Sequence, residues 1–141
     1  MRTMTEEEWR DFVSEGTRTG KVAVTRADGH PHVTPVWFVL DGTDVLFNTS
    51  ARSLKGRALR RDPRVSISVD DQVPPYSFVK IDGVAEITED LGELRRWATA
   101  IGGRYMGADK AEEFGRRNGV PGELLVRVRP TRVTSERDLA S

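Results

Sequence analysis

The stretch that decides the fold is GKVAVTRADGHPHVTPVWFVLDGTDVLFNTS, residues 20–50. It contains three runs rich in β-branched and aromatic residues, which favour strands. The runs are separated by Asp28-Gly29 and Asp41-Gly42, dipeptides that favour tight turns between antiparallel strands. We therefore expect three consecutive antiparallel strands here, joined as a meander.

Three further strand-like runs lie outside this stretch. They are RVSISVDD at residues 64–71, YSFVKIDGVAEIT at residues 76–88 and GELLVRVRPTRVTS at residues 122–135. Pro130 falls inside the last run, and a proline within a sheet is tolerated mainly at an edge or a bulge. Six antiparallel strands with few helices predict a mostly β fold, a six-stranded antiparallel split β-barrel with peripheral helices.

Helical patterns surround the predicted strands. In residues 1–16, Thr5 and Glu8 have the spacing of a capping box, and Gly16 is placed to end the helix. A helical insertion at residues 88–118 is interrupted by glycines at 102–103 and 107. The 141 residues fit a single domain, in which residues 20–87 carry the barrel strands and residues 122–135 form the closing strand.

The composition argues against several classes of protein. The chain has 22 basic and 22 acidic residues, whereas proteins that bind polyanions or membrane surfaces are usually more basic. We therefore expect no nucleic-acid and no membrane partner. There is no cysteine, which excludes disulfides and thiolate chemistry. No run approaches the roughly 20 apolar residues of a membrane span, and the N-terminus lacks the apolar core of a signal peptide, so we expect a cytoplasmic protein.

The sequence offers no pattern for a metal site or a nucleophile. His30 and His32 would point to the same face of a strand, but no third ligand lies near them, so we interpret them as ordinary turn and strand residues. Ser50 and Ser53 lack the adjacent histidine of a nucleophilic site. Walker and Rossmann glycine loops are also absent. We therefore predict no metal ion and assign no catalytic residue.

A local excess of positive charge is the strongest functional signal. Residues 47–64, FNTSARSLKGRALRRDPR, hold six basic residues and one acidic residue. A short helix is expected from Ser53, a good N-cap, to the Asp-Pro step at 62–63. Its first turn would present unpaired backbone N–H groups, and Arg52 and Lys55 would add charge there, which predicts a phosphate site. The alternative is a solvated basic helix face.

Several fragments together resemble a known family. They are GHPHVTPVWFVLDG at residues 29–42, VLFNTS at 45–50, SLKGRALRRDPRVSISVDD at 53–71 and FVKIDGVAEI at 78–87. From about Gly20 to Val133 the chain resembles the flavin-reductase-type split β-barrel of the pyridoxamine 5'-phosphate oxidase superfamily. With RYMG and LLVRVRPTRV, it is most similar to the branch that uses the deazaflavin coenzyme F420. The resemblance implies a homodimer whose cofactor lies in a groove between the two barrels.

The resemblance also implies which residues bind the cofactor. Thr34, Pro35 and Val36 match the strand along which the ring lies, and Asn48, Thr49 and Ser50 match the strand end that faces the ring and its ribityl-type chain. Arg52, Ser53, Lys55 and Gly56 match the phosphate-binding turn. By charge alone, the acidic tail of F420 can run outward from this turn over Arg57, Arg60 and Arg61. Tyr76, Ser77 and Phe78 of the partner subunit match the segment that closes over the ring.

The sequence departs from the FMN-dependent oxidases of this superfamily in two places. Those oxidases place an arginine immediately before the phosphate-binding lysine, where this chain has Leu54, and their C-terminal arginine and histidine pattern is absent. We therefore expect a coenzyme F420-dependent reductase that transfers hydride from reduced F420 to a small or medium-sized conjugated substrate. Two alternatives stay open: an FMN-binding oxidase or electron carrier of the same fold, and a non-catalytic protein that binds F420 or a tetrapyrrole.

Overall fold

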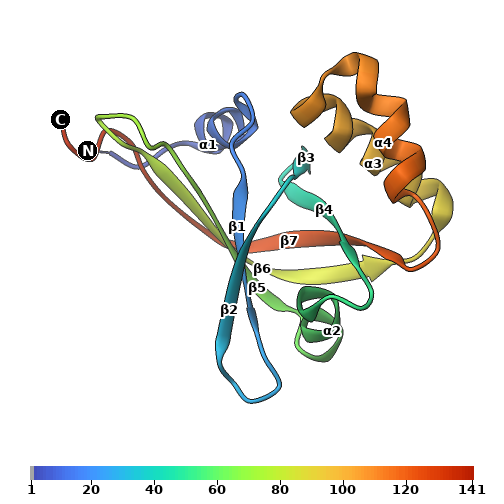
Figure 1. Ribbon diagram of the computed structural model, residues 1–141. Helices are drawn as coiled ribbons and strands as arrows, with labels where there is room; N and C mark the ends of the chain where they lie inside the picture. Colours follow the sequence, from blue (N-terminus) through green and yellow to red (C-terminus); the bar gives the residue numbers. More distant parts are fainter. Residues whose placement is uncertain (1) are drawn as a thin grey trace.

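Seven strands form one sheet in the computed structural model, which describes residues 2–141 (Figure 1). The strands lie in the order β2-β1-β5-β6-β7-β4-β3, and all neighbours are antiparallel. Their bounds are β1 Gly20–Thr25, β2 Pro31–Val36, β3 Val39–Asp41, β4 Asp44–Ser50, β5 Arg64–Asp70, β6 Phe78–Thr88 and β7 Glu123–Glu136. The prediction of a mostly β antiparallel fold is confirmed, but the predicted number of six strands is wrong.

The additional strand arises because the middle run of the opening stretch is divided at Trp37 and Phe38. Its first part, β2, pairs with β1, whereas its second part, β3, pairs with β4. The backbone N–H of Phe38 donates to Tyr105 Oη at 3.2 Å, and its C=O accepts from Arg104 Nη1 at 2.7 Å. Two side chains of a distant helix thus satisfy the backbone at this corner in place of a neighbouring strand.

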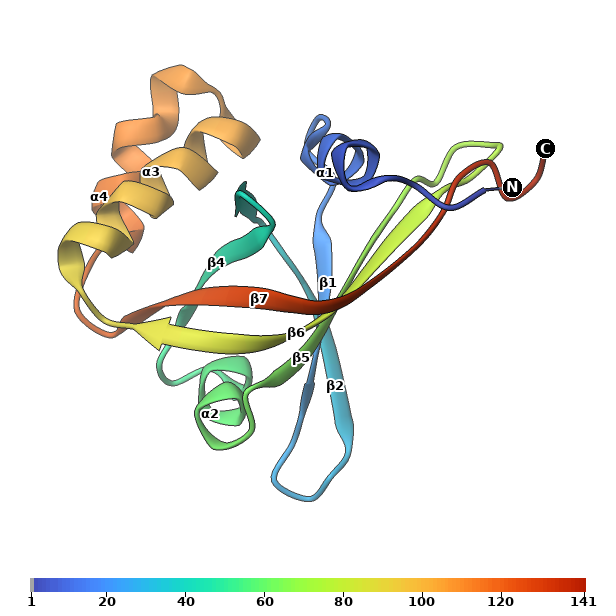
Figure 2. The same cartoon turned by 180° about the vertical axis from the view of Figure 1, so that it is seen from behind.

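The sheet is not closed into a complete barrel. Its two edges are β2 and β3, and no hydrogen-bonded pairing joins them within residues 2–141. Because β2 and β3 are consecutive in the chain, only Trp37 and Phe38 separate the two edges of a strongly bent sheet (Figures 1 and 2). The predicted split β-barrel is therefore not closed by hydrogen bonds between its edge strands. Helix α2 (Leu54–Arg61) contacts β1 next to one edge and β4 next to the other.

Helix α1 (Glu6–Ser14) begins and ends as the sequence predicts. Thr5 Oγ1 accepts from the N–H of Glu8 at 3.2 Å, and the N–H of Thr5 donates to Glu8 Oε1 at 3.1 Å, so the capping box is confirmed. Gly16 follows the helix with φ +58°, a conformation that favours glycine. The helix buries Trp9 and Phe12 in the main core, which also receives side chains from α2 and from the inner face of the sheet.

Helices α3 (Leu91–Met106) and α4 (Ala111–Asn118), joined by the short helix η1 (Ala108–Lys110), lie on the side of the molecule away from the two termini (Figures 1 and 2). The predicted break at Gly107 is confirmed, with φ +103°. The predicted break at 102–103 is wrong, because α3 continues through both glycines. Gly102 instead allows close packing, since a Cβ at this position would overlap the Cβ of Phe114.

Strand β7 pairs with β6 and contains the expected irregularity. Asp82 of β6 pairs with Arg132, whereas Gly83 pairs with Pro130, so the register shifts there and Thr131 is the extra residue of a bulge. A Cβ at Gly83 would lie 2.5 Å from the carbonyl oxygen of Arg129. The interpretation of Pro130 as a bulge position is confirmed.

Candidate cofactor-binding site

The first turn of α2 is built by a hydroxyl network that follows β4. Ser53 is the N-cap, as predicted, and its Oγ accepts from the N–H of Gly56 at 3.0 Å. The same Oγ donates to the carbonyl oxygen of Ser50 at 2.7 Å and lies 2.8 Å from Thr49 Oγ1. One donated and two accepted hydrogen bonds use the full capacity of a hydroxyl. In this structure Ser53 and Thr49 therefore shape the turn, and their contact with a phosphate stays a prediction.

Gly56 is required by the close approach of α2 to the end of β4. A Cβ at this position would lie 2.5 Å from the carbonyl oxygen of Ser50 and 3.2 Å from Leu124 Cδ1. Such a distance to a backbone atom cannot be relieved by a side-chain movement. The glycine that the sequence places in a phosphate turn thus has a packing role that brings the N-terminus of α2 against β4.

Lys55 links this turn to β2, the strand predicted to lie along the cofactor ring. Its ammonium donates to Thr34 Oγ1 on β2 at 2.9 Å, a contact between two predicted site residues from separate elements. Lys55 forms no ion pair within the part of the chain that the structure describes. Partial burial lowers the pKa of its ammonium, because removal from water penalises the charged form. A half-buried cation with one neutral partner is poised to gain from a bound anion.

The charged residues near Lys55 in the sequence, from 51 to 61, are all basic. The first turn of α2 contains no acidic residue, and Arg52 precedes the N-cap. The backbone N–H groups of Leu54 and Lys55 make no hydrogen bond within residues 2–141, as is usual at a helix N-terminus. The positive end of the helix dipole and the ammonium therefore act at the same place. Arg57, also predicted in the site, donates from Nε to the carbonyl oxygen of Ser53 at 3.4 Å.

The two predicted site segments on strands, residues 34–36 of β2 and 48–50 of β4, differ in the burial and hydrogen bonding of their side chains. On β2, Thr34 is half-buried beside Lys55, Pro35 is exposed and Val36 is buried in the core. On β4, the side-chain Nδ2 of Asn48 is buried and has no hydrogen-bond partner among the described residues. Buried polar atoms are nearly always paired, so Asn48 is a donor that an added acceptor would satisfy. Ser50 Oγ accepts from the N–H of Arg52 at 3.1 Å.

The third predicted segment, Tyr76 to Phe78, lies far from α2 in the same chain. Phe78 begins β6, and the start of β5 next to α2 pairs with Val84, so the separation along β6 is roughly 20 Å at about 3.3 Å per residue. Tyr76 is 43% exposed with φ +61°. Ser77 is buried, and its Oγ accepts from the N–H of Asp138 at 3.1 Å. One chain therefore brings together the β2, β4 and α2 residues but not these three.

Comparison with known proteins identifies the family to which the chain belongs. The model of the family described as pyridoxamine 5'-phosphate oxidase matches residues 5–136. The chain belongs to this family. The resemblance inferred from the sequence fragments is thus confirmed at the level of the superfamily.

Several solved structures are similar to this chain over most of its length. A conserved hypothetical protein from Mycobacterium tuberculosis is 34% identical, with a TM-score of 0.84 over 98% of this chain and 89% of that one. An F420 reductase is 27% identical, with a TM-score of 0.69 over 87% of this chain and 94% of that one. The haem storage protein HutZ from Vibrio cholerae is 19% identical, with a TM-score of 0.74 over 98% and 100% of the two chains, a likeness that shows the fold alone.

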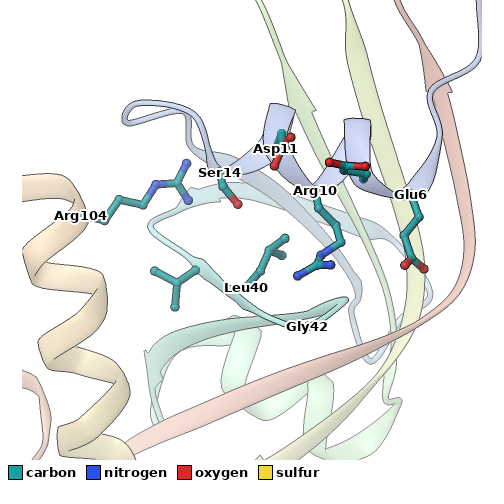
Figure 3. Close-up of a pocket in the computed structure, with 9 residues that line it drawn as sticks. Glu6, Arg10, Asp11, Ser14, Leu40, Gly42 and Arg104 are labelled. Carbon is teal, nitrogen blue, oxygen red and sulfur yellow. The ribbon is translucent and has the colours of Figure 1, made fainter.

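A cavity of about 700 Å³ lies elsewhere on the molecule, between α1 and the β3–β4 turn (Figure 3). Arg10 and Asp11 of α1, Leu40 of β3 and Arg104 of α3 line it, and none of the residues implied by the family resemblance does. The Arg104 guanidinium donates to the carbonyl oxygens of Val13, Gly16 and Phe38 at 2.7, 3.0 and 2.7 Å. Each of its three nitrogens thus donates to a backbone carbonyl that holds the fold.

A second cavity, which the sequence did not predict, lies beside the site. About 470 Å³ in volume, it is lined by Ser50 and Arg52 together with Arg117 and Glu123 from the α4–β7 region. The signal in the sequence was the pair of arginines just before the closing strand, but nothing local indicates that they return to α2. Within residues 2–141 no cluster of three or more His, Asp or Glu side chains is arranged to hold a metal ion, and no helix is long and apolar enough to span a bilayer.

Proposed function

We propose that this member of the pyridoxamine 5'-phosphate oxidase family is a coenzyme F420-dependent reductase that acts on small or medium-sized conjugated compounds. The observation that carries the proposal is the half-buried ammonium of Lys55, whose one hydrogen-bond partner among residues 2–141 is the neutral Thr34 hydroxyl, at 2.9 Å. The 27% identity to an F420 reductase supports the choice of cofactor. The absence of an arginine at Leu54, where FMN-dependent relatives carry one, favours F420 over FMN.

The residues present fit such a cofactor. The ammonium of Lys55 and the free N–H groups at the start of α2 would hold a phosphodiester. Thr34 is fixed by its hydrogen bond to Lys55. It would hold β2, the strand along which the ring is expected to lie, next to the phosphate turn. The orphaned amide of Asn48 would donate to a polar edge of the ring or its chain.

Reduced F420, when bound, supplies a hydride. The protein's own part is to bind the phosphate, orient the ring along β2 and leave one face open to a substrate. Burial of Val36 and the corner at Trp37 and Phe38 keep the end of β2 rigid. No side chain of the site has to act as a nucleophile, which agrees with the lack of a nucleophilic pattern in the sequence.

We further propose that the active form is a homodimer. Val33 on β2 and Val84 on β6 are 63% and 40% exposed on the outer face of the sheet, beside a hollow of about 580 Å³ that includes Ala23 and Pro31. Exposed apolar surface of this kind favours a partner. A second copy would also explain how Tyr76 of the partner subunit reaches the ring, since roughly 20 Å separates the two regions within one chain.

Side-by-side titration of the purified protein with F420 and FMN tests the cofactor, followed by oxidation of reduced F420 in the presence of conjugated acceptors. The proposal predicts tighter binding of F420 and turnover with at least one acceptor. FMN binding that is equal or tighter at physiological salt would favour the FMN alternative. F420 or haemin binding without any turnover would favour a non-catalytic binding protein. Light scattering that shows a monomer with cofactor bound would contradict the dimer.

A further inference from the structure

The cavity between the end of β4 and the start of β7 lies next to the phosphate turn. Ser50 pairs directly with Glu123 across the two strands, so their side chains project from the same face at about 5 Å between Cβ atoms. The N–H of Ala51 donates to the carbonyl oxygen of Gly122 at 2.9 Å, which holds the β4–α2 loop against the α4–β7 loop (Figure 1). Arg52 and Arg117 complete the walls of this cavity of about 470 Å³.

The two arginines of the cavity have unused donors. Within the described residues, neither the Arg52 nor the Arg117 guanidinium forms an ion pair or donates a hydrogen bond. Arg117 is held in place from another side, because its guanidinium carbon lies 5.3 Å from the centre of the Phe114 ring. Phe114 in turn packs closely against Gly102 of α3. The guanidinium is therefore positioned by packing and still free to bind an anion.

Glu123 adds an acceptor to the same cavity. Its side chain is half-buried and makes no hydrogen bond or ion pair in the part of the chain that the structure describes. Burial raises the pKa of this carboxyl, because desolvation penalises the carboxylate. Two unpaired arginines and one unpaired carboxyl in one cavity form a set that a ligand carrying both carboxylates and N–H donors would satisfy.

We infer that this cavity is a second subsite, which takes a carboxylate-bearing, amide-containing extension of the ligand whose phosphate is held at Lys55. Arg52 and Arg117 would bind the carboxylates, and Glu123 would accept from an amide N–H. The inference rests on the proposed function, since the oligoglutamyl tail of F420 has this chemistry.

The position of the cavity agrees with a continuous ligand path. Thr34 and Lys55 mark one side of the α2 N-terminus, and Ser50 and Arg52 mark the other side, towards Glu123. A ligand that runs from β2 past the phosphate turn reaches Arg52 next.

The route over Arg57 and Arg60, which the sequence favours, has fewer free donors. Arg60 forms an ion pair with Glu89 at 3.2 Å, and Arg57 donates to the carbonyl oxygen of Ser53. The structure thus supports a tail that turns towards β7 instead of following α2.

The experiment compares the dissociation constants of two forms of F420, one without glutamates and one with the natural oligoglutamyl tail. The parent should bind the tailed form more tightly. Arg52→Ala and Arg117→Ala should each reduce this tail-dependent gain by about fivefold, the upper range of a partly screened charge pair. The double variant should lose the tail-dependent gain in affinity entirely, and the salt dependence of that gain should disappear with it. Affinity for the tail-less form should change little in Arg117→Ala.

The matched control is Arg116→Ala, since Arg116 is an exposed neighbour on α4 that pairs with Glu112 at 3.8 Å; it should keep the full gain. Equal loss in Arg116→Ala, or no loss in the double variant, would overturn the subsite. Loss in Arg57→Ala alone would overturn it in favour of the route along α2. If neither form of F420 binds the parent, the proposed function and the subsite both fail. If the tail-less form binds and the tail adds no affinity, only the subsite fails.

Discussion

Two half-buried cations without a carboxylate partner, Arg104 and Lys55, serve different ends in this molecule. The Arg104 guanidinium donates to three carbonyl oxygens and lies over the rings of Phe38 and Tyr105, with distances of 4.7 and 4.9 Å to the ring centres. The Lys55 ammonium has one hydroxyl partner. Burial lowers the pKa of both groups. The difference teaches that a half-buried cation whose three nitrogens each donate to a backbone carbonyl holds the fold, whereas one with a single neutral hydroxyl partner is a candidate for binding.

The carbonyls that Arg104 binds come from separate parts of the chain. Val13 lies at the end of α1, Gly16 in the following turn and Phe38 at the corner between β2 and β3. Tyr105 assists, since its hydroxyl donates to the carbonyl oxygen of Arg18 at 2.7 Å and accepts from Phe38. The last turn of α3 thus fixes α1 against the divided strand.

The largest loss of stability is expected for Arg104→Ala. Three backbone carbonyls would lose their partner, and each such loss costs about 1 kcal/mol or more, so the free energy of unfolding should fall by roughly 3 kcal/mol. Urea denaturation measures this. Arg104→Lys, which keeps the charge but not the planar fork, should lie in between. A loss below that of an ordinary surface substitution would contradict the structural role of Arg104.

A smaller loss is expected for Gly56→Ala, which tests how closely α2 must approach β4. A Cβ would lie 2.5 Å from the carbonyl oxygen of Ser50, so the helix must shift, at a cost of roughly 2 kcal/mol. Gly92→Ala is the matched control in α3, since its nearest neighbour, Asp90 Oδ2, lies 3.6 Å away. The control should stabilise the protein by up to about 1 kcal/mol. Thermal unfolding of both variants checks the contrast, and equal gains would contradict the packing role of Gly56.

In contrast to the two cations without a carboxylate partner, Glu8 is a carboxylate that forms an ion pair, with Arg2. Its oxygens accept from Arg2 at 3.0 and 2.7 Å, and this hydrogen bonding holds the pKa of Glu8 at about 2. A lowered pKa stabilises the fold fully above the unfolded value near 4.5, and this contribution is lost as pH falls through about 2. Parent and Glu8→Gln should therefore differ in stability at pH 7 and converge towards pH 2 in urea titrations. A constant difference across this range would contradict the assignment.

The local features of the fold were predictable because short-range chemistry determines them. The capping box of Thr5 and Glu8 and the N-cap at Ser53 need only neighbouring residues. The Asp-Gly turns were also correct: Gly29 and Gly42 have φ of +86° and +63°. The basic turn of α2 was found for the same reason, since its charge and cap lie within a few residues.

The errors came from long-range contacts. The division of the middle strand depends on Arg104 and Tyr105, more than 60 residues away in the chain. Likewise, α3 passes through Gly102 because Phe114 packs against it, a contact that outweighs the low helix propensity of glycine. The cavity with Arg117 and Glu123 was missed because it forms only when the α4–β7 loop returns to β4.

The central claim is that Lys55 serves binding and not folding, and one paired measurement on Lys55→Ala tests it most directly. The free energy of unfolding should change by less than about 0.5 kcal/mol, because the ammonium has a single neutral partner. Affinity for F420, titrated at fixed salt, should fall by about one to two orders of magnitude, the value of one charge-assisted phosphate contact. Arg61→Ala is the control, since this exposed arginine donates to the carbonyl oxygen of Thr25 at 3.3 Å, and its effect on affinity should be small. A large loss of stability in Lys55→Ala, or equal small losses of affinity in the two variants, would contradict the account.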